Sequence, residues 1–454
     1  MESLFKTNFN WGIFLLLCFI IFILFPSLSL YSYFALVISI HQLFLLFYSI
    51  NYVLPIRYLF GTLMCLQMFI GPVLAYNGLD KYQYYMYIMR VPEALYFSYT
   101  IPAVIGFILG LHIASGKLKG EFIDESKIRY FLYKNKDLPF WFIGIGFVSS
   151  LTAYLFSADF AFVFYLLGNF KYIGVFLLVL GGKQVKLFPL ILVFSSVVFS
   201  SLGEGMFHDL LTWFIMIGAV LALKFKPNIK LKFITCILFI IFTVIIQQVK
   251  GSYRESTRQG MEAGLETFQM AYETGKENNT LFSFKSLSEN SIRINQGFII
   301  TNIMQTVPSR VPYANGDEFW LIVQAAVLPR ILAPDKLNAG DRELFTKYSG
   351  LNIKRGTSMG LSSVGDAYIN FGIFGGCIFM FLLGLLYNGV LKGFYTYSKN
   401  FPLLLLFVPI VFYYPIRPDC ELQTILGHLV KSCFLIFVIF IIWKRQFRVQ
   451  PVES

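Results

Sequence analysis

The chain has 454 residues, of which 57% are hydrophobic, 18% aromatic and only 14% charged, with a mean hydropathy of +0.66. Soluble domains carry about 25% charged residues, so this composition excludes a soluble globular protein and predicts an integral membrane protein. The net charge of +12 suggests a nucleic-acid partner, but the positive residues lie mostly in short loops between apolar runs. That distribution is typical of membrane topology and argues against nucleic-acid binding.

A helix needs about 20 apolar residues to cross a bilayer. In chain order, twelve runs are predicted to span, near residues 11–25, 31–50, 56–76, 93–113, 139–157, 160–180, 187–201, 208–223, 233–249, 365–391, 401–416 and 421–443. The first run lacks a small-residue cleavage site and is followed at once by another apolar run, so it is predicted to be a span and not a signal peptide.

These runs predict an all-α polytopic membrane protein with about 12 transmembrane helices and one large external loop. Residues 1–249 form an N-terminal bundle of about nine spans. Residues 250–364 form the external loop, and residues 365–454 form about three further spans and a cytoplasmic tail.

Positive charge in the short loops predicts the orientation. Alternate loops and the two termini hold nineteen Lys or Arg residues, among them the six of loop 114–138 and the four of loop 224–232. The short loops of the opposite face hold only Lys81, Arg90 and Arg417. The excess predicts that both termini are cytoplasmic and that the large loop lies outside.

The large loop is predicted to be folded, because it is rich in aromatic and aliphatic residues. Met261, Leu265, Phe268 and Tyr272 recur at helical spacing and predict an amphipathic helix. The apolar stretch 319–328 is too short to span and suits a re-entrant or interfacial helix, with Asp317 as its cap in front and Pro329 as its stop.

A further short helix is predicted from Asp341 to Tyr348, with Asp341 as N-cap and Gly350 beyond its end. In the tenth span, Gly372, Gly375 and Gly376 are expected to allow close packing against a neighbouring helix.

Cations in the loop are the strongest functional signal. Residues 250–364 hold thirteen Lys or Arg and eleven Asp or Glu, which a lipid-embedded segment does not tolerate. Arginine binds phosphate oxygens in pairs, whereas lysine acts as a point charge. The candidates for binding a lipid-linked pyrophosphate are Lys250, Arg254, Arg293, Arg330 and Lys336. Each alone is also consistent with a solvated residue or a contact to lipid headgroups.

Two acidic groups are candidates for the chemical step. Asp366, at the mouth of the tenth span with Tyr368 and Asn370 nearby, has the position to take a proton from a sugar hydroxyl or to orient the sugar. An N-cap of that span explains it equally well. Glu204, His208 and Asp209 form a second external group, in which His208 is a possible base. Helix capping by Asp209 and simple solvation are the alternatives.

Other residues have two interpretations. Tyr253, Tyr313, Trp320 and Tyr368 suit stacking on sugar faces, but aromatic residues also anchor at membrane interfaces. Lys171 and Lys431 fall inside predicted spans, where a cation marks a cavity or extends to the interface.

Several motifs are absent from the sequence. It contains no Gly-rich phosphate loop, no HExxH, no nucleophile elbow and no DxD-type carboxylate pair. The six cysteines show no CxxC spacing, and most lie in apolar runs. No metal site, disulfide framework or cofactor is therefore predicted, and a nucleotide sugar held through a metal is disfavoured as donor.

The segments VKGSYRES, SIRINQG, LPRILAPDK and SSVGDAYINFGIFGG, within about 248–376, carry a resemblance to a known family. Together with the long loop late in a multi-span chain, they resemble the oligosaccharide repeat-unit polymerases, or Wzy-type O-antigen polymerases. The resemblance implies a GT-C-like fold, similar to the C-type lipid-dependent glycosyltransferases. It also implies that Arg254, Arg293 and Arg330 bind pyrophosphate.

The resemblance implies transfer of a polymer from undecaprenyl pyrophosphate to a new lipid-linked repeat unit, at the outer face of a bacterial cytoplasmic membrane. The expected product is an O-antigen, capsule or exopolysaccharide. A flippase and a chain-length regulator are its possible partners.

Two rival functions stay open. O-antigen ligases use an Arg-plus-His pattern in their large loop, and this loop contains no histidine. A flippase or exporter of the lipid-linked repeat usually shows duplicated halves and a polar central path. Here no internal repeat is visible, and the polar residues concentrate outside the spans.

Overall fold

The computed structural model describes residues 10–78, 87–113, 123–156, 158–205, 207–277, 294–328, 337, 340–353 and 359–448. These residues form helices and no strand. Nine helices in the described part are long and apolar enough to cross a membrane: Leu30–Ser49 (α3), Ile56–Tyr76 (α4 to α5), Glu93–His112 (α6), Phe162–Gly181 (α9 to α10), Leu187–Glu204 (α11), His208–Phe225 (α12), Ile229–Arg258 (α13), Ser362–Tyr397 (α19) and Leu422–Ile442 (α21). The prediction of a polytopic all-α membrane protein is confirmed.

The other three predicted spans correspond to shorter helices. They are α2 (Trp11–Leu24), α8 (Leu138–Thr152) and α20 (Leu404–Val411), with 14, 15 and 8 residues. All eight residues of α20 are buried. The segment 412–421 that follows α20 is also largely buried, so the connection from α20 to α21 lies inside the protein and not on its surface.

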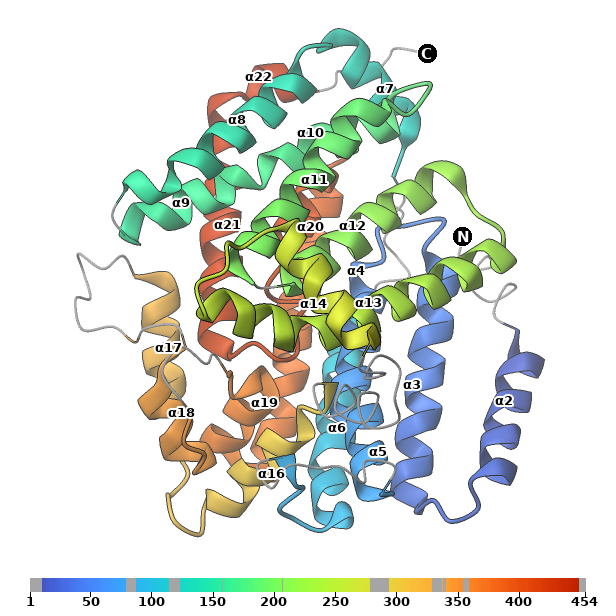
Figure 1. Ribbon diagram of the computed structural model, residues 1–454, viewed down its shortest axis with the longest axis vertical. Helices are drawn as coiled ribbons and strands as arrows, with labels where there is room; N and C mark the ends of the chain where they lie inside the picture. The colour runs from blue at the N-terminus through green and yellow to red at the C-terminus, as the bar shows by residue number, and fades with distance from the viewer. Residues whose placement is uncertain are drawn as a thin grey trace.

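The helices fall into two groups in Figure 1. Helices α3, α6 and α19 run along the long axis, whereas α10 to α13 cross it obliquely. Helix α7 (Glu125–Lys134) and α22 (Lys444–Phe447) lie at one end of the molecule, and α16 (Gly297–Thr306) and α18 (Arg342–Ser349) lie towards the other.

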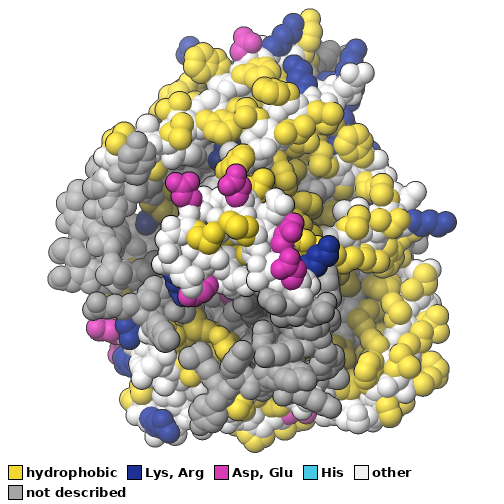
Figure 2. Space-filling model, in the orientation of Figure 1, with side chains coloured by type: hydrophobic (Ala, Val, Ile, Leu, Met, Phe, Trp, Pro, Cys, Tyr) yellow, Lys and Arg dark blue, Asp and Glu magenta, His cyan; other side chains and the backbone are white. Residues whose placement is uncertain are grey.

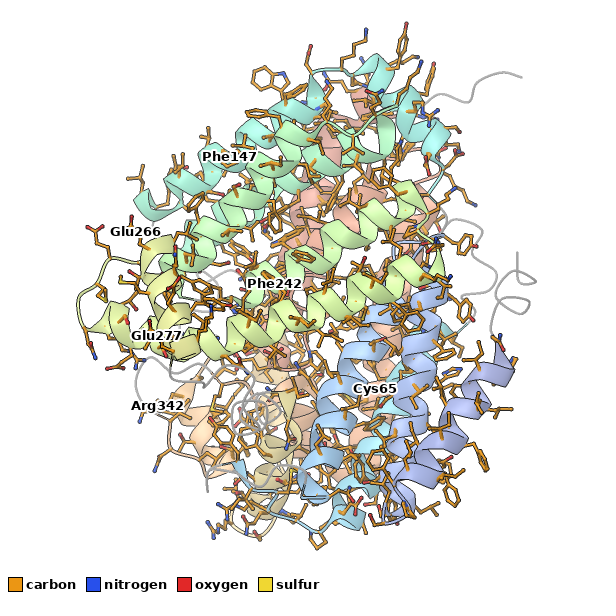
Figure 3. The ribbon with its side chains drawn as sticks, turned by 45° about the vertical axis from the view of Figure 1, so that its right-hand side comes forward. Cys65, Phe147, Phe242, Glu266, Glu277 and Arg342 are labelled. Atoms are coloured by element: carbon orange, nitrogen blue, oxygen red, sulfur yellow. The ribbon has the colours of Figure 1, made fainter. Side chains whose placement is uncertain are left out.

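The outer surface matches a lipid environment. Figure 2 shows hydrophobic side chains over the flank formed by α2 and α3, while Lys and Arg gather towards the end that carries α7. Helix α13 exposes Ile234, Ile237, Leu238, Ile240 and Ile241, each more than 40% exposed. In Figure 3 the acidic Glu266 and Glu277 of α14 (Leu265–Glu277) project at one edge, away from Phe242 on α13. The two labelled acidic residues of α14 thus lie apart from Phe242 of α13.

The packing of α6 against α19 depends on glycine. A Cβ atom at Gly384 would clash with the Phe107 carbonyl oxygen, and one at Gly110 would clash with that of Phe381. Small residues let helix backbones approach closely, and the resulting van der Waals contacts contribute to helix association in lipid. Gly376 likewise packs against Tyr99, as predicted, whereas Gly372 has φ 65° and interrupts the helical geometry of α19.

A buried arginine closes the end of α6. Arg57 is 2% exposed, and its Nη1 donates to the Leu111 carbonyl and to Asn388 Oδ1, the latter at 2.8 Å. Asn388 Nδ2 donates in turn to the Ile113 carbonyl at 2.8 Å. The last carbonyls of a helix have no partner inside the helix, so these side chains satisfy groups that water cannot reach.

The part of the predicted external loop that the structure describes is largely folded into helices. Helix α13 continues nine residues beyond the predicted span, and α14, α16, α17 (Asp317–Val327) and α18 follow. The predicted helix 341–348 is confirmed: Asp341 accepts from the backbone of Glu343 and Leu344, and Gly350 ends α18 in the left-handed conformation. Helix α14 begins at Leu265, which leaves Met261 and Leu265 on the exposed surface at 41% and 62%.

The glycine contact predicts a paired result. Gly384→Ala should destabilise the protein by about 1–3 kcal/mol, because overpacking forces α6 and α19 apart. Gly389→Ala, on the same helix with open space around it, should be neutral or stabilising because alanine favours the helix. Thermal unfolding of the purified variants in detergent measures both. Equal Tm values for the two variants would contradict the close contact.

Candidate functional site

Two of the predicted site residues hold the ends of other helices. Asp366 Oδ2 accepts from the backbone N–H of Leu422, the first residue of α21, at 2.7 Å. Asn370 Oδ1 accepts from the N–H of Phe319 in α17 at 3.0 Å. Both side chains are buried, at 4% and 2% exposed. One turn of α19 therefore supplies the caps for two helix N-termini.

These contacts correct two sequence interpretations. Asp366 lies inside α19, whose N-cap is Leu361, so it does not cap its own helix. The Asp366 side chain is buried and accepts a hydrogen bond from the Leu422 backbone. A role in positioning α21 therefore fits it better than the role of a base. Asp317 is the first residue of α17 and Gly316 is its N-cap, so the prediction of Asp317 as cap was wrong.

Two of the predicted sugar-stacking aromatics are core residues. Tyr253 is 0% exposed and donates to the Leu202 carbonyl at 2.7 Å. Tyr368 is 4% exposed, lies 3.5 Å from the Tyr313 hydroxyl and packs its ring against Tyr99. A buried ring offers no face to a sugar, so the structure places these two tyrosines in the protein core. Trp320, at 61%, is exposed.

The end of α13 meets the turn between α11 and α12. Arg254 Nε donates to the Gly205 carbonyl at 2.8 Å, and Gly205 adopts φ 61°, a left-handed turn that favours glycine. Glu204 is exposed beside it, and Lys250 lies one turn before Arg254 on α13. The structure thus brings together Lys250, Arg254, Glu204 and His208, which come from two separate stretches of the sequence.

An imidazole–carboxylate pair begins α12. His208 Nε2 lies 2.6 Å from Asp209 Oδ1, with the two side chains 37% and 31% exposed. The close approach of the Asp209 carboxylate favours the tautomer with its proton on Nε2, which leaves the lone pair on Nδ1. His208 follows Gly205 by three residues, so it lies within about 11 Å of the Arg254 contact.

The buried connection between α20 and α21 contributes a second ion pair, which the sequence interpretation missed. Arg417 Nη2 lies 3.1 Å from Asp419 Oδ2, and the guanidinium lies 5.5 Å from the Tyr414 ring centre. The Arg417 side chain is only 15% exposed. The sequence did contain a signal for this residue. Arg417 lies in a short loop on the face where short loops hold few positive residues.

The two pairs lie within electrostatic range of each other. Asp209 interacts electrostatically with Arg417, and Asp419 with His208. Burial alone would raise the pKa of Asp419, but the charge and hydrogen bond of Arg417 outweigh burial and lower it. We call His208, Asp209, Arg254, Arg417 and Asp419 the polar cluster. Its residues lie at the start of α12, near the end of α13 and in the buried segment 412–421.

The polar cluster adjoins the caps on α19. Glu421 accepts from the Gly340 backbone at 2.5 Å and from Thr424 Oγ1 at 3.0 Å, and it interacts electrostatically with Asp366. Burial raises the pKa of Glu421 above its ordinary value. Segment 412–421 therefore carries Arg417 in its middle, and its last residue, Glu421, lies near Asp366 of α19 and contacts Gly340 just before α18.

Three predicted cations, Arg293, Arg330 and Lys336, lie outside the described residues. Within the residues that are described, no three His, Cys, Asp or Glu side chains group closely enough to hold a metal ion. Lys171 is 8% exposed and contacts Phe147 and Tyr172, whereas the Lys431 ammonium lies over Phe162 at 4.6 Å. Aromatic contacts thus accompany both intramembrane lysines.

The fold and the polar cluster define a polytopic helical membrane protein with a charged site where its spans end. A family model described as a domain of unknown function (DUF8712) matches residues 53–393, and the chain belongs to this family. The match runs from the start of α4 almost to the end of α19, so Arg417 and Asp419 lie beyond it. No curated protein and no solved structure matches the chain.

The ion pair predicts a pH dependence. A carboxylate whose folded pKa is lowered stabilises the protein above its unfolded pKa, about 3.9 for Asp, and that stability is lost as the pH falls through the folded pKa. Asp419→Asn should therefore lower Tm at neutral pH, and its difference from wild type should shrink on acidification. Asp137→Asn, at an exposed position, is the control. A constant difference at every pH would contradict the pairing.

Proposed function

We propose that the protein is a membrane glycosyltransferase that polymerises lipid-linked oligosaccharide repeat units into a surface polysaccharide. The observation that carries this proposal is the His208–Asp209 pair within electrostatic range of Arg417, with Arg254 bonded to Gly205, three residues before His208. Guanidinium groups suit a pyrophosphate, and a membrane-exit position suits a pyrophosphate attached to a lipid. The resemblance of 248–376 to the repeat-unit polymerases supports the same activity.

The proposal includes a topology. The nine long helices, together with α2, α8 and α20, make twelve membrane segments in a GT-C-like arrangement. Both termini lie in the cytoplasm, and α14 to α18 lie outside the cytoplasmic membrane. The opposite placement of α7 with α22 and of α16 with α18 supports this orientation, as does the excess of positive charge in the loops on the α7 side.

In the proposed reaction, a hydroxyl of the incoming repeat unit attacks the anomeric carbon of the growing chain. The bond from that carbon to the pyrophosphate oxygen breaks, and a glycosidic bond forms. The hydroxyl proton passes to His208 Nδ1, and Asp209 stabilises the imidazolium. Arg254, Arg417 and Lys250 stabilise the charge on the departing lipid pyrophosphate, an effect that is strongest in a partly dehydrated site.

Supporting residues set the geometry of this site. The Gly205 carbonyl fixes the Arg254 guanidinium, and Asp419 and Tyr414 fix that of Arg417. Asp366 holds the start of α21 and, with it, the segment that carries Arg417. Preorganised charges of this kind need no rearrangement when charge develops in the transition state.

Arg254→Ala should reduce polymer by at least about 100-fold, since removing one preorganised donor to developing charge costs on that order. The surface glycan of a deletion strain that expresses the variant is separated by size. Arg258→Ala, exposed at the last turn of the same helix, should keep the wild-type ladder. Wild-type chain lengths with Arg254→Ala, at equal membrane abundance, would overturn the assignment.

Deletion of the gene separates the proposed activity from its rivals. A single repeat unit on the normal acceptor, with no longer chains, is expected of a polymerase. Long polymer retained on the lipid carrier would indicate a ligase. Lipid-linked single repeats that accumulate inside the cell, with no glycan at the outer face, would indicate a flippase. Either of the last two outcomes overturns the proposal.

A further inference from the structure

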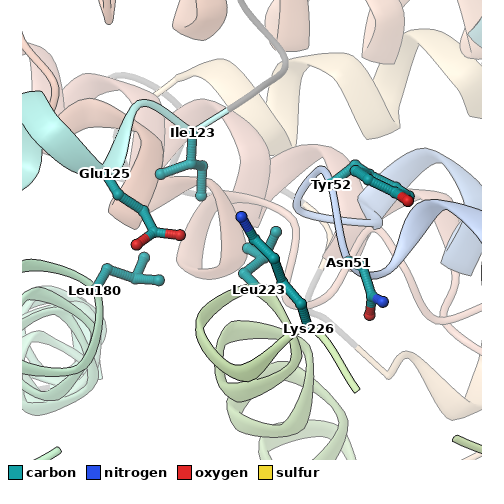
Figure 4. A pocket seen from close by; sticks show the side chains of 7 residues that line it. All are labelled: Asn51, Tyr52, Ile123, Glu125, Leu180, Leu223 and Lys226. Atoms are coloured by element: carbon teal, nitrogen blue, oxygen red, sulfur yellow. The ribbon is translucent and has the colours of Figure 1, made fainter. Parts of the chain in front are cut away.

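A small pocket lies far from the polar cluster, at the opposite ends of the helices. It is lined by Asn51, Tyr52, Ile123, Glu125, Leu180, Leu223 and Lys226, with a volume of about 130 Å³ (Figure 4). Asn51 follows α3, Glu125 begins α7, Leu180 is near the end of α10, and Lys226 follows α12. Three candidate membrane spans therefore end around it, which is the level of lipid headgroups.

The pocket combines opposite charges. Figure 4 shows the Glu125 carboxylate and the Lys226 ammonium directed towards the same space. Among the ion pairs of the described residues, none joins these two groups to each other or to a third group. One acid and one base that do not neutralise each other suit a ligand that carries both charges.

The amide of Asn51 adds an acceptor. Its Nδ2 donates to the Pro227 carbonyl at 2.9 Å, which fixes the assignment of the two amide atoms. Its Oδ1 is buried and accepts no hydrogen bond within the described part of the chain. A buried acceptor without a donor costs free energy, so a ligand that carries N–H groups would find two acceptors here, Asn51 and Glu125.

The backbone at Lys226 also indicates function. Lys226 has φ 47° in the left-handed region, where glycine is the favoured residue. A long charged side chain is strained at this position, and such strain is most often kept at functional sites. The ammonium group, which glycine would lack, is what this position supplies to the pocket.

We propose that this pocket binds the headgroup of an aminophospholipid, in which a primary ammonium and a phosphate lie a few bonds apart. Lys226 binds the phosphate, and Glu125 with Asn51 accepts from the ammonium. Ile123, Leu180 and Leu223 contact the carbon atoms between and beyond them. A quaternary ammonium has no N–H to donate, so phosphatidylethanolamine should bind and phosphatidylcholine should not. The inference is independent of the proposed function.

The test uses the full chain in nanodiscs of phosphatidylcholine alone or of equal parts phosphatidylcholine and phosphatidylethanolamine. Bound ligand stabilises the folded state, so phosphatidylethanolamine should raise Tm by several degrees. Lipid that co-purifies with the protein should be enriched in phosphatidylethanolamine relative to the bulk membrane. The same Tm in both nanodiscs, with no enrichment, would overturn the proposal.

Two variants and a control identify the site. Glu125→Gln and Lys226→Gly should each abolish the Tm rise and the enrichment, and Lys226→Gly suits the backbone and should fold normally in phosphatidylcholine. Lys230→Ala, exposed on α13 and outside the pocket, should respond like wild type. If both pocket variants keep the preference for phosphatidylethanolamine, the lipid binds elsewhere and the proposal fails.

A further arm distinguishes the lipid from a soluble ligand of the same chemistry. Glycerophosphoethanolamine is added to the protein in phosphatidylcholine nanodiscs. A weaker Tm rise than that given by the lipid supports a headgroup site. A rise with the soluble compound and none with the lipid would overturn the assignment to a membrane lipid.

Discussion

Helix ends inside this protein have no water to satisfy their backbone groups, and that constraint determines how its centre is built. Side chains of α19 satisfy such backbone groups at the ends of three other helices. Asp366 serves the N-terminus of α21, Asn370 serves that of α17, and Asn388 serves the C-terminus of α6. Because the first of these contacts holds segment 412–421 in place, the position of Arg417 depends on α19 as well.

The elements that depend on local sequence could be predicted. Apolar runs of sufficient length gave the nine long helices, and the Asp341 cap and Gly350 stop gave α18, because both signals lie within a few residues of the helix they define. The partner of Asp366 lies 56 residues away along the chain. No local pattern indicates which distant helix end a buried carboxylate will meet, so the contact of Asp366 with α21 could not be predicted.

In the candidate site, too, local features could be predicted and long-range contacts could not. Arg254, Lys250, Glu204 and His208 were recognisable as polar residues at span ends, but their meeting depends on the packing of α13 against the turn after α11. The burial of Tyr253 and Tyr368 could not be predicted, because a tyrosine next to polar residues is equally compatible with the surface and the core. Arg417 was counted only for topology, since its burial follows from the short α20 and its inward connection.

The buried Arg57 has a consequence for biogenesis. Its acceptor Asn388 lies 331 residues later in the chain, so a ribosome releases α4 and α6 long before α19 exists. Until α19 is made, the Arg57 guanidinium lacks Asn388 as an acceptor. The buried contacts of Arg57 are thus complete only after α19 has been synthesised.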